Sequence, residues 1–461
     1  MQTMTIDEAF ASYAEDKKSK TPLNAFLELY ADAPALAKSA NSDNPESPEK
    51  PLAGITFAVK DNISVKGKNL TCGSRILEGY KAPYSATVIE RLTKSGAVPL
   101  GRCNMDEFAM GSSTEYSVYG PTRNPVNREY VSGGSSGGPA AAVAAGLVTF
   151  GLGTETGGSV RLPASYCGIY GLKTSYGVLS RWGVVAYGSS LDQVGILART
   201  VDDVALPLFV MSGKDFYDGT SEDLPQKDAL QNMTPLSEKE LSALRIAIPR
   251  QFIEAPGLDA EVAAVFAATQ QKLADLGACI DIVDIPVLDA AVASYYVIAF
   301  SEAASNLSRF DGIRYGKRLD PGEGFDELYV KTRSEGFGAE VKRRIIIGNY
   351  VLSEQFSGDC YKKAMSVRAK IQKDIACVFS SGYDIILCPT CPTPPFKIGQ
   401  KVDDPLEMYL TDLYTTFVNL SRIPSLSIPS GFTQAGLPVG IQMAGSMFSE
   451  VQLLRIAKAL E

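Results

Sequence analysis

The spacing of apolar residues changes several times along the first hundred residues. Ala and Leu recur at helical spacing in residues 5–38, which predicts a helical N-terminal segment. The polar, proline-containing stretch 39–51 then predicts a linker. GITFAVKDN (54–62) mixes apolar and small residues and ends in polar ones, which is typical of a strand leading into a loop. SATVIERLTKSG (85–96) predicts a helix that ends at a glycine, followed by a short strand at 97–101.

The rest of the chain continues this alternation. Residues 140–146 predict a buried helix of small residues, and LVTFGLG (147–153) predicts the strand after it. A helix–strand–helix–strand order is expected between 198 and 290, with a polar surface excursion at 213–241. Further helices are expected at 288–310, 339–379 and 450–460, and further strands at 383–389, 424–429 and 437–445. This order predicts an α/β protein whose central mixed β-sheet is covered by helices on both faces.

Composition narrows the classes of function. The chain has 461 residues, of which 45% are hydrophobic and 21% charged, the balance of an ordinary globular protein. Its net charge of −8 is unfavourable for holding a nucleic-acid backbone, which leaves open an assembly in which another subunit holds the nucleic acid. The sequence contains no run of about 18 uninterrupted apolar residues, and we therefore expect no membrane span and no membrane partner.

Eight cysteines are scattered through the chain, which begins with a polar, acidic segment and not with an apolar leader. Scattered cysteines after a polar N-terminal segment favour reduced thiols and a cytoplasmic location. Only Cys388 and Cys391 have the sequence spacing of metal ligands, and the second pair that a tetrahedral zinc site needs is missing. No metal site is therefore predicted, and the pair is interpreted as part of a tight proline-rich loop after a strand.

The chain contains no histidine, which limits the chemistry open to its serines. Ser135 and Ser159 lie in two glycine-dense turns, and a serine nucleophile needs a base to take its proton. Because a Ser-His-Asp triad is impossible, the base must be Lys, Asp, Glu or Tyr, and Ser-Lys arrangements are a recognised variant. The turn Thr156-Gly157-Gly158 would present backbone N–H groups that can bind an oxyanion. The alternative left open by the residues is that these turns only allow close backbone packing.

Three stretches resemble the amidase signature family. GGSSGG (133–138) is followed by the ETGGS turn (155–159) and by RLPASYCGIYGLK (161–173), and the strand at 54–62 is similar to that family's lysine-bearing strand end. The resemblance implies the amidase signature fold and one amidase domain over 1–461, made of an N-terminal helical segment and linker (1–50) and a catalytic core (51–461).

The same resemblance implies a role for each residue of the candidate site. Ser159 would be the nucleophile, Ser135 the bridging serine and Lys60 the base. The bridging serine of the family follows a cis peptide bond, which would be the bond between Gly134 and Ser135 in this sequence. Thr156, Gly157 and Gly158 would form the oxyanion hole.

Four longer stretches outside the signature (101–125, 294–316, 333–353 and 403–421) are similar to the glutaminase subunits of tRNA-dependent amidotransferases, a group within that family. This similarity implies that Tyr295, Arg344 and Asp412 hold glutamine, because a guanidinium can pair with its α-carboxylate and a carboxylate with its α-ammonium. It also implies partner B and C subunits, with charged tRNA, ATP and Mg²⁺ held mainly by B, and no cofactor in this chain. Without the resemblance, a buried structural ion pair or a core tyrosine is the favoured interpretation of each of the three residues.

Two other functions stay open at this point. One is a stand-alone amidase of the same superfamily that acts on a small amide and needs no partner. The other is a catalytically silent assembly subunit. The presence of Lys60, Ser135 and Ser159 counts against this last function.

Overall fold

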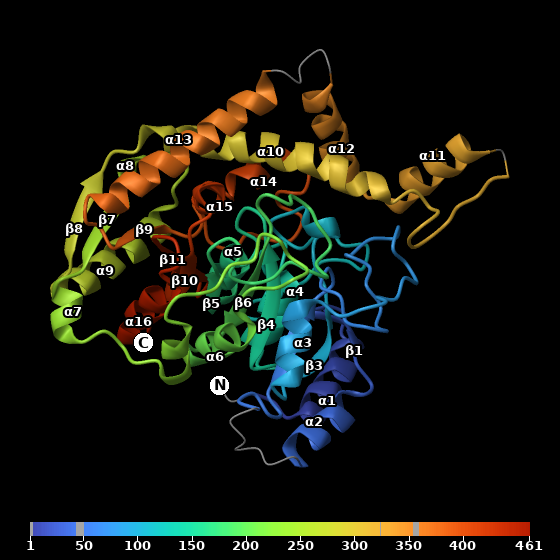
Figure 1. The fold of residues 1–461 in the computed structure, drawn as a ribbon, viewed down its shortest axis with the longest axis horizontal. Coiled ribbons are helices and arrows are strands. Elements are labelled where there is room, and N and C mark those ends of the chain that lie inside the picture. The colour runs from blue at the N-terminus through green and yellow to red at the C-terminus, as the bar shows by residue number, and fades with distance from the viewer. Residues whose placement is uncertain (1–2, 43–49, 323, 354–358) are drawn as a thin grey trace.

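A large mixed β-sheet runs through the molecule (Figure 1). The computed structural model describes residues 3–42, 50–322, 324–353 and 359–461. Within these residues the sheet has eleven strands in the order β1-β3-β2-β4-β6-β5-β10-β11-β9-β7-β8. Their bounds are Phe26–Leu29 (β1), Thr56–Lys60 (β2), Val98–Cys103 (β3), Phe150–Glu155 (β4), Tyr170–Lys173 (β5), Gln193–Ala198 (β6), Arg245–Pro249 (β7), Cys279–Val283 (β8), Ile385–Pro389 (β9), Ser425–Phe432 (β10) and Pro438–Gly445 (β11).

Both strand orientations occur in the sheet, which confirms the predicted mixed α/β architecture. β2 pairs in parallel with β3 and β4, and β7 pairs in parallel with β8 and β9. The strands between these two groups pair antiparallel. In the pairing of β4 with β6, Glu155 lies opposite Gln193, so the residues just beyond this pair, Thr156 and Asp192, are brought side by side.

Helices cover the sheet on both faces. On β4, Gly151 lies against Pro139 and Val143 of α4, whereas its neighbour Phe150 lines a cavity with Leu206 of α6. Because successive strand residues point to opposite faces, α4 and α6 pack on opposite sides of the sheet. The helices are Ile6–Asp16 (α1), Ala33–Ser42 (α2), Thr87–Lys94 (α3), Gly137–Ala144 (α4), Arg161–Cys167 (α5), Asp202–Met211 (α6), Glu238–Ser242 (α7), Arg250–Ile253 (α8), Ala260–Asp275 (α9), Ala291–Asn306 (α10), Phe325–Gly336 (α11), Ala339–Leu352 (α12), Cys360–Ser380 (α13), Pro405–Leu410 (α14), Thr416–Ser421 (α15) and Glu450–Leu460 (α16).

A layer of long helices built on α10 closes one side of the molecule. In Figure 1, α10, α12 and α13 lie across the upper side, opposite α1 and α2. The segment Pro286–Arg309, which contains α10, is long and apolar enough to cross a membrane by length and composition alone. In the structure 61% of its most apolar window is buried against the rest of the protein, because α10 packs on α12, α13 and α15.

The prediction of one helical segment over 5–38 is wrong in its middle part. α1 and α2 are separated by β1, which pairs antiparallel with β3, with Phe26 opposite Cys103 and Leu29 opposite Gly101. A backbone ladder to a distant strand outweighs the weak helical spacing of four residues. Of the predicted linker 39–51, residues 43–49 lie outside the described part of the chain.

The excursion at 213–241 is less superficial than predicted. It includes α7 and a short 3-10 turn, and five of its apolar side chains are buried: Leu224, Leu230, Met233, Leu236 and Leu241. They pack into the large core beside α6 and α16. Apolar residues scattered among polar ones therefore fix this segment to the core.

Candidate active site

The candidate catalytic residues lie where β2 and β4 end. The two strands are parallel neighbours, so their C-terminal ends meet at the same edge of the sheet. Lys60 is the last residue of β2, and Glu155, the last residue of β4, leads into the turn that carries Ser159. Ser135 lies just before α4, which packs on both strands.

The amine of Lys60 is buried and contacts two serine hydroxyls. Its Nζ donates to Ser135 Oγ at 2.8 Å, to Ser136 Oγ at 2.8 Å and to the carbonyl of Thr154 at 3.1 Å. The peptide bond between Gly134 and Ser135 is cis. Ser136 was not singled out from the sequence, because only its place beside Ser135 in a Gly/Ser run could have indicated it.

Burial also changes the acidity of this amine. It lowers the pKa of Lys60 to about 7, while the carboxylates of Asp106, Asp192 and Glu155 act in the opposite direction. A lysine with this pKa is neutral in a large fraction of molecules at neutral pH, so it can accept a proton. The composition had left four residue types open as the base, and the geometry places the lysine against a serine.

Ser159 stands at the start of α5 and is the least buried of the three predicted catalytic residues. Its carbonyl accepts a hydrogen bond of 3.2 Å from the backbone N–H of Ser136, which joins the two glycine-dense turns. The buried carboxylate of Glu155 accepts from the backbone N–H groups of Val160 and Arg161 and pairs with the Arg161 guanidinium. The turn around Ser159 is therefore held at both ends.

The turn before Ser159 has the features of an oxyanion-binding site. No hydrogen bond is recorded from the backbone N–H of Gly157, Gly158 or Ser159 to any described residue, so these donors are available to a ligand. Side chains crowd the turn closely: a Cβ on Gly157 would overlap the Tyr295 ring, and one on Gly158 would overlap the hydroxyl of Thr415. Glycine is thus required at both positions by close approach.

Tyr295 links this turn to the predicted glutamine residues. It belongs to α10, it is buried, and its ring packs on that of Tyr296 with centroids 4.9 Å apart. Arg344 on α12 and Asp412 after α14 are also buried, and both charges act on the Tyr295 hydroxyl. The structure therefore brings together three residues from distant parts of the chain beside the candidate oxyanion turn.

Arg344 is fixed within a cage of aromatic rings. Its guanidinium lies 5.2–5.8 Å from the ring centroids of Tyr187, Tyr296, Phe300 and Tyr409. Nε donates to Glu340 at 2.8 Å and Nη1 donates to the hydroxyl of Tyr187 at 2.9 Å. No partner for Nη2 is recorded among the described residues, so this nitrogen and the second proton of Nη1 remain for a carboxylate.

Asp412 is a buried carboxylate that Tyr296 connects to this cation. It accepts from the hydroxyl of Tyr296 at 2.7 Å and from that of Ser112 at 3.1 and 3.2 Å. Burial raises the pKa of Asp412 to about 6, against the hydrogen bonds and the Arg344 charge, which lower it. Asp412 is therefore ionised at neutral pH.

Sequence reasoning missed four residues that complete this region: Ser112, Tyr187, Tyr296 and Glu340. Only Glu340 carries a signal in the sequence, because its i,i+4 spacing to Arg344 is that of a helical ion pair. The others lie far from their partners in the chain.

The described residues contain no group of three or more Cys, Asp and Glu side chains arranged to hold a metal ion. Cys388 and Cys391 are buried, and Cys388 Sγ accepts from Gln442 Nε2 at 3.3 Å. All eight cysteines are unpaired.

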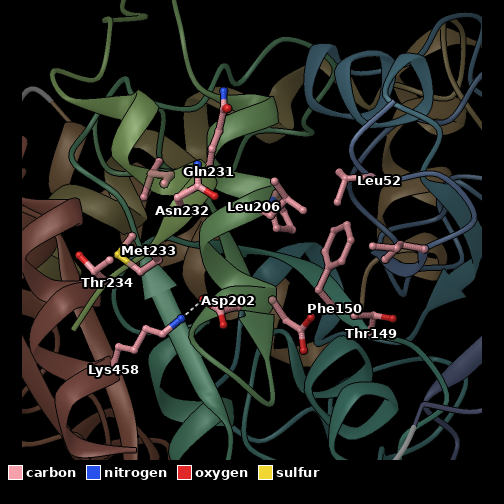
Figure 2. A pocket seen from close by; sticks show the side chains of 14 residues that line it. Leu52, Thr149, Phe150, Asp202, Leu206, Gln231, Asn232, Met233, Thr234 and Lys458 are labelled. Carbon is pink, nitrogen blue, oxygen red and sulfur yellow. Dashed lines mark hydrogen bonds and ion pairs between the residues drawn. The ribbon is translucent and has the colours of Figure 1, made fainter. Parts of the chain in front are cut away.

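A separate cavity of about 450 Å³ lies at the opposite end of β4 (Figure 2). Phe150 and Leu206 line it, and Lys458 pairs with Asp202 at its rim. Phe150 begins the strand that Glu155 ends, so the length of β4 separates this cavity from the candidate active site.

An α/β fold with a buried lysine, a cis-linked serine and a serine at a helix start defines a class of serine hydrolase that needs no histidine. The amidase family profile matches residues 8–454. The chain belongs to the amidase family.

Individual relatives cover almost the whole chain. The glutamyl-tRNA(Gln) amidotransferase A subunit of Treponema denticola is 57% identical over 465 residues, covering 100% of this chain and 96% of that protein. The corresponding protein of Bacillus velezensis, which has the same name, is 47% identical over 460 residues, covering 99% and 92%. Among solved structures, the glutamyl-tRNA(Gln) amidotransferase A subunit of Thermotoga maritima has a TM-score of 0.76 at 39% identity, covering 99% and 94%.

Proposed function

We propose that this chain is the glutamine-hydrolysing A subunit of a glutamyl-tRNA(Gln) amidotransferase. The relatives that match its full length carry that name. The observation that carries the proposal is the buried pair of opposite charges, Arg344 and Asp412, beside the turn at Gly157 and Gly158. A generic amide lacks the two charged groups that would pair with Arg344 and Asp412, whereas the α-carboxylate and α-ammonium of free glutamine match them.

Glutamine is held by its backbone groups. Its α-carboxylate binds the free edge of the Arg344 guanidinium, and its α-ammonium binds Asp412. Tyr295 packs alongside and directs the side chain toward the glycine turn. The carboxamide then lies at Ser159, with its oxygen toward the N–H groups of the turn.

Acylation follows from the protonation state of Lys60. The neutral amine takes the proton of Ser135 while Ser135 takes the proton of Ser159, and Ser159 Oγ attacks the carboxamide carbon. The carbonyl oxygen becomes an oxyanion that the N–H groups around Thr156, Gly157 and Gly158 stabilise. The relayed proton passes to the amide nitrogen, the C–N bond breaks, and ammonia leaves the glutamyl-enzyme.

Deacylation runs through the same groups in reverse. A water molecule gives a proton to the relay as its oxygen attacks the ester carbon. The tetrahedral intermediate collapses, the proton returns to Ser159, and glutamate is released. Ser136, which shares the Lys60 amine with Ser135, holds that amine in place throughout.

Ammonia passes to a B subunit that activates Glu-tRNA(Gln) with ATP and Mg²⁺, a C subunit supports the pair, and tRNA is held through B. The chain acts as one domain over 1–461, which its single sheet supports within the described residues. Eight unpaired cysteines fit a cytoplasmic location.

The test is steady-state glutamine hydrolysis by the isolated chain, then with B and C subunits and charged tRNA added. We expect ammonia release that partners and tRNA stimulate strongly. Ser159→Ala should assemble with the partners and release no ammonia above background. Unstimulated hydrolysis of many simple amides, or full activity of Ser159→Ala, would overturn the proposal.

A further inference from the structure

One loop joins the two ends of the candidate site. The loop Tyr187–Asp192 precedes β6, and its first residue contacts Arg344 while its last contacts the oxyanion-binding turn. None of its residues belongs to the candidate catalytic or glutamine-binding set. Its role is therefore a question that the proposed function leaves open.

At one end, Tyr187 orients Arg344. The tyrosine is buried, and its hydroxyl accepts the 2.9 Å hydrogen bond from Arg344 Nη1. Glu340 holds Nε of the same guanidinium, so two hydrogen bonds at different nitrogens define its plane. A guanidinium held in this way presents its remaining N–H groups in one direction. A carboxylate can then accept two parallel hydrogen bonds from them.

At the other end, Asp192 orients the oxyanion turn. Its carboxylate accepts from the hydroxyl of Thr156 at 2.6 Å, from the backbone N–H of Tyr187 at 2.9 Å and from that of Gly188 at 3.0 and 3.1 Å. No cation contacts Asp192 among the described residues, so these donors satisfy the buried charge. Gly188 itself approaches Thr156 so closely that a Cβ there would lie 3.2 Å from Thr156 Cγ2.

Hydrogen bonds from side chains outside the loop support it. The carbonyl of Tyr187 accepts from Asn306 Nδ2 at 3.1 Å, and Arg368 donates to the carbonyl and hydroxyl of Ser190 at 2.9 and 2.7 Å. The hydroxyl of Tyr176 donates to the carbonyl of Ser189 at 2.8 Å. Loops that position catalytic groups need this kind of support, because small displacements of oriented donors reduce rates strongly.

We propose that Tyr187 and Asp192 are positioning residues with separate tasks: Tyr187 sets the specificity for an α-carboxylate through Arg344, and Asp192 aligns the oxyanion-binding turn through Thr156. Neither touches the substrate, and the proposal rests on the proposed glutamine hydrolysis. The two tasks have different kinetic signatures. Loss of the Tyr187 hydroxyl weakens ground-state binding of the substrate α-carboxylate. Loss of the Asp192 carboxylate destabilises the transition state for every amide.

The experiment compares two amides in the assembled enzyme: glutamine and 4-aminobutanamide, which is glutamine without its α-carboxylate. For Tyr187→Phe we expect the KM for glutamine to rise about 10-fold at nearly constant kcat, since one hydrogen bond to a charged group is lost. Hydrolysis of 4-aminobutanamide should not change. Tyr13→Phe, which removes a 3.0 Å hydrogen bond from α1 to the carbonyl of Leu27 in β1, is the matched control and should leave the hydrolysis of both substrates unaffected.

The second arm tests Asp192. For Asp192→Asn we expect kcat to fall about 10- to 100-fold for both amides, with KM changed by less than about threefold. Thr156→Val should reproduce this fall and Thr156→Ser should restore most of the activity. The double variant Thr156→Val/Asp192→Asn should lose no more than the worse single variant, because both remove the same contact.

The outcomes separate the two proposals. If wild-type enzyme hydrolyses both amides with similar kcat/KM, the proposed recognition of glutamine fails. If wild type prefers glutamine but Tyr187→Phe weakens both amides equally, or leaves the KM for glutamine unchanged, the role of Tyr187 is overturned. Additive losses in the Thr156 and Asp192 cycle would overturn the role of Asp192. Thr156→Val tests the same contact should Asp192→Asn fail to fold.

Discussion

The ring of Tyr295 occupies the space that a side chain at Gly157 would need. A Cβ on Gly157 would overlap ring carbon Cζ and lie 2.5 Å from the hydroxyl oxygen. This contact joins α10, which carries the proposed glutamine-binding residue Tyr295, to the turn before Ser159 that is the candidate oxyanion-binding site.

Gly157→Ala should therefore damage both activity and stability. The added methyl group must push Tyr295 or the turn aside, and overpacking of this kind costs about 1–3 kcal/mol. We expect a lower Tm and a fall in kcat of at least about 10-fold, because the displaced turn carries the oxyanion donors. Gly219→Ala is the control, since its Cβ would meet nothing within 4 Å. Equal behaviour of the two variants would contradict the packing argument.

The pH dependence of kcat/KM should report Lys60. The relay needs the neutral amine, and burial lowers the Lys60 pKa to about 7, so kcat/KM should rise with pH below about 7 and level off above it. Asp412, with a pKa of about 6, must be ionised to bind the α-ammonium, so the KM for glutamine should increase below about pH 6. A flat profile of kcat/KM between pH 5.5 and 8 would rule out Lys60 as the base.

Asp106 offers a direct check on this assignment. Its buried carboxylate accepts from the backbone N–H groups of Thr114 and Tyr116 and raises the pKa of Lys60 by its charge. Asp106→Asn removes that charge, so the acid limb of the kcat/KM profile should move to lower pH. A shift to higher pH would mean that another group controls the limb.

Arg344 and Asp412 should act on binding more than on chemistry. Arg344→Lys keeps the charge but loses the planar fork, and Asp412→Asn loses the charge that faces the α-ammonium. We expect the KM for glutamine to rise about 30- to 100-fold in each, corresponding to about 2–3 kcal/mol for a buried charged contact. Arg102→Lys, at a buried arginine paired with Asp61 at 2.9 Å, is the matched control for loss of a structural guanidinium. An unchanged KM in either site variant would show that glutamine is held elsewhere.

Glu155 should stabilise the folded protein by holding the turn that bears Ser159. It is fully buried, pairs with Arg161 and accepts from the N-terminal N–H groups of α5. Glu155→Gln leaves the Arg161 charge uncompensated, so urea unfolding should give a free energy of unfolding about 3–5 kcal/mol lower. Glu254→Gln, in the exposed i,i+4 pair with Arg250, should change it by less than about 1 kcal/mol. Equal changes in the two variants would contradict this role.

Local sequence predicted the elements that carry the candidate chemistry. The strand ending at Lys60, the small-residue helix after Ser135 and the later strands β9, β10 and β11 all form close to their expected places. These elements are recognisable because their signals are local: a buried apolar run, a glycine turn or a helical stripe. By contrast, β1, β5 and β6 were not predicted, because their short segments become strands only by pairing with distant neighbours.

The sequence by itself determined that imidazole takes no part, that two serines lie in glycine-rich turns and that a lysine ends a nearby strand, since these are properties of composition and short segments. Only the tertiary structure decided that Lys60 meets Ser135 and Ser136, and that Tyr187 and Glu340 hold Arg344. Such contacts join residues far apart in the chain, and burial alone brings the Lys60 pKa near neutrality. Both depend on how the helices and the sheet pack, which no local pattern specifies.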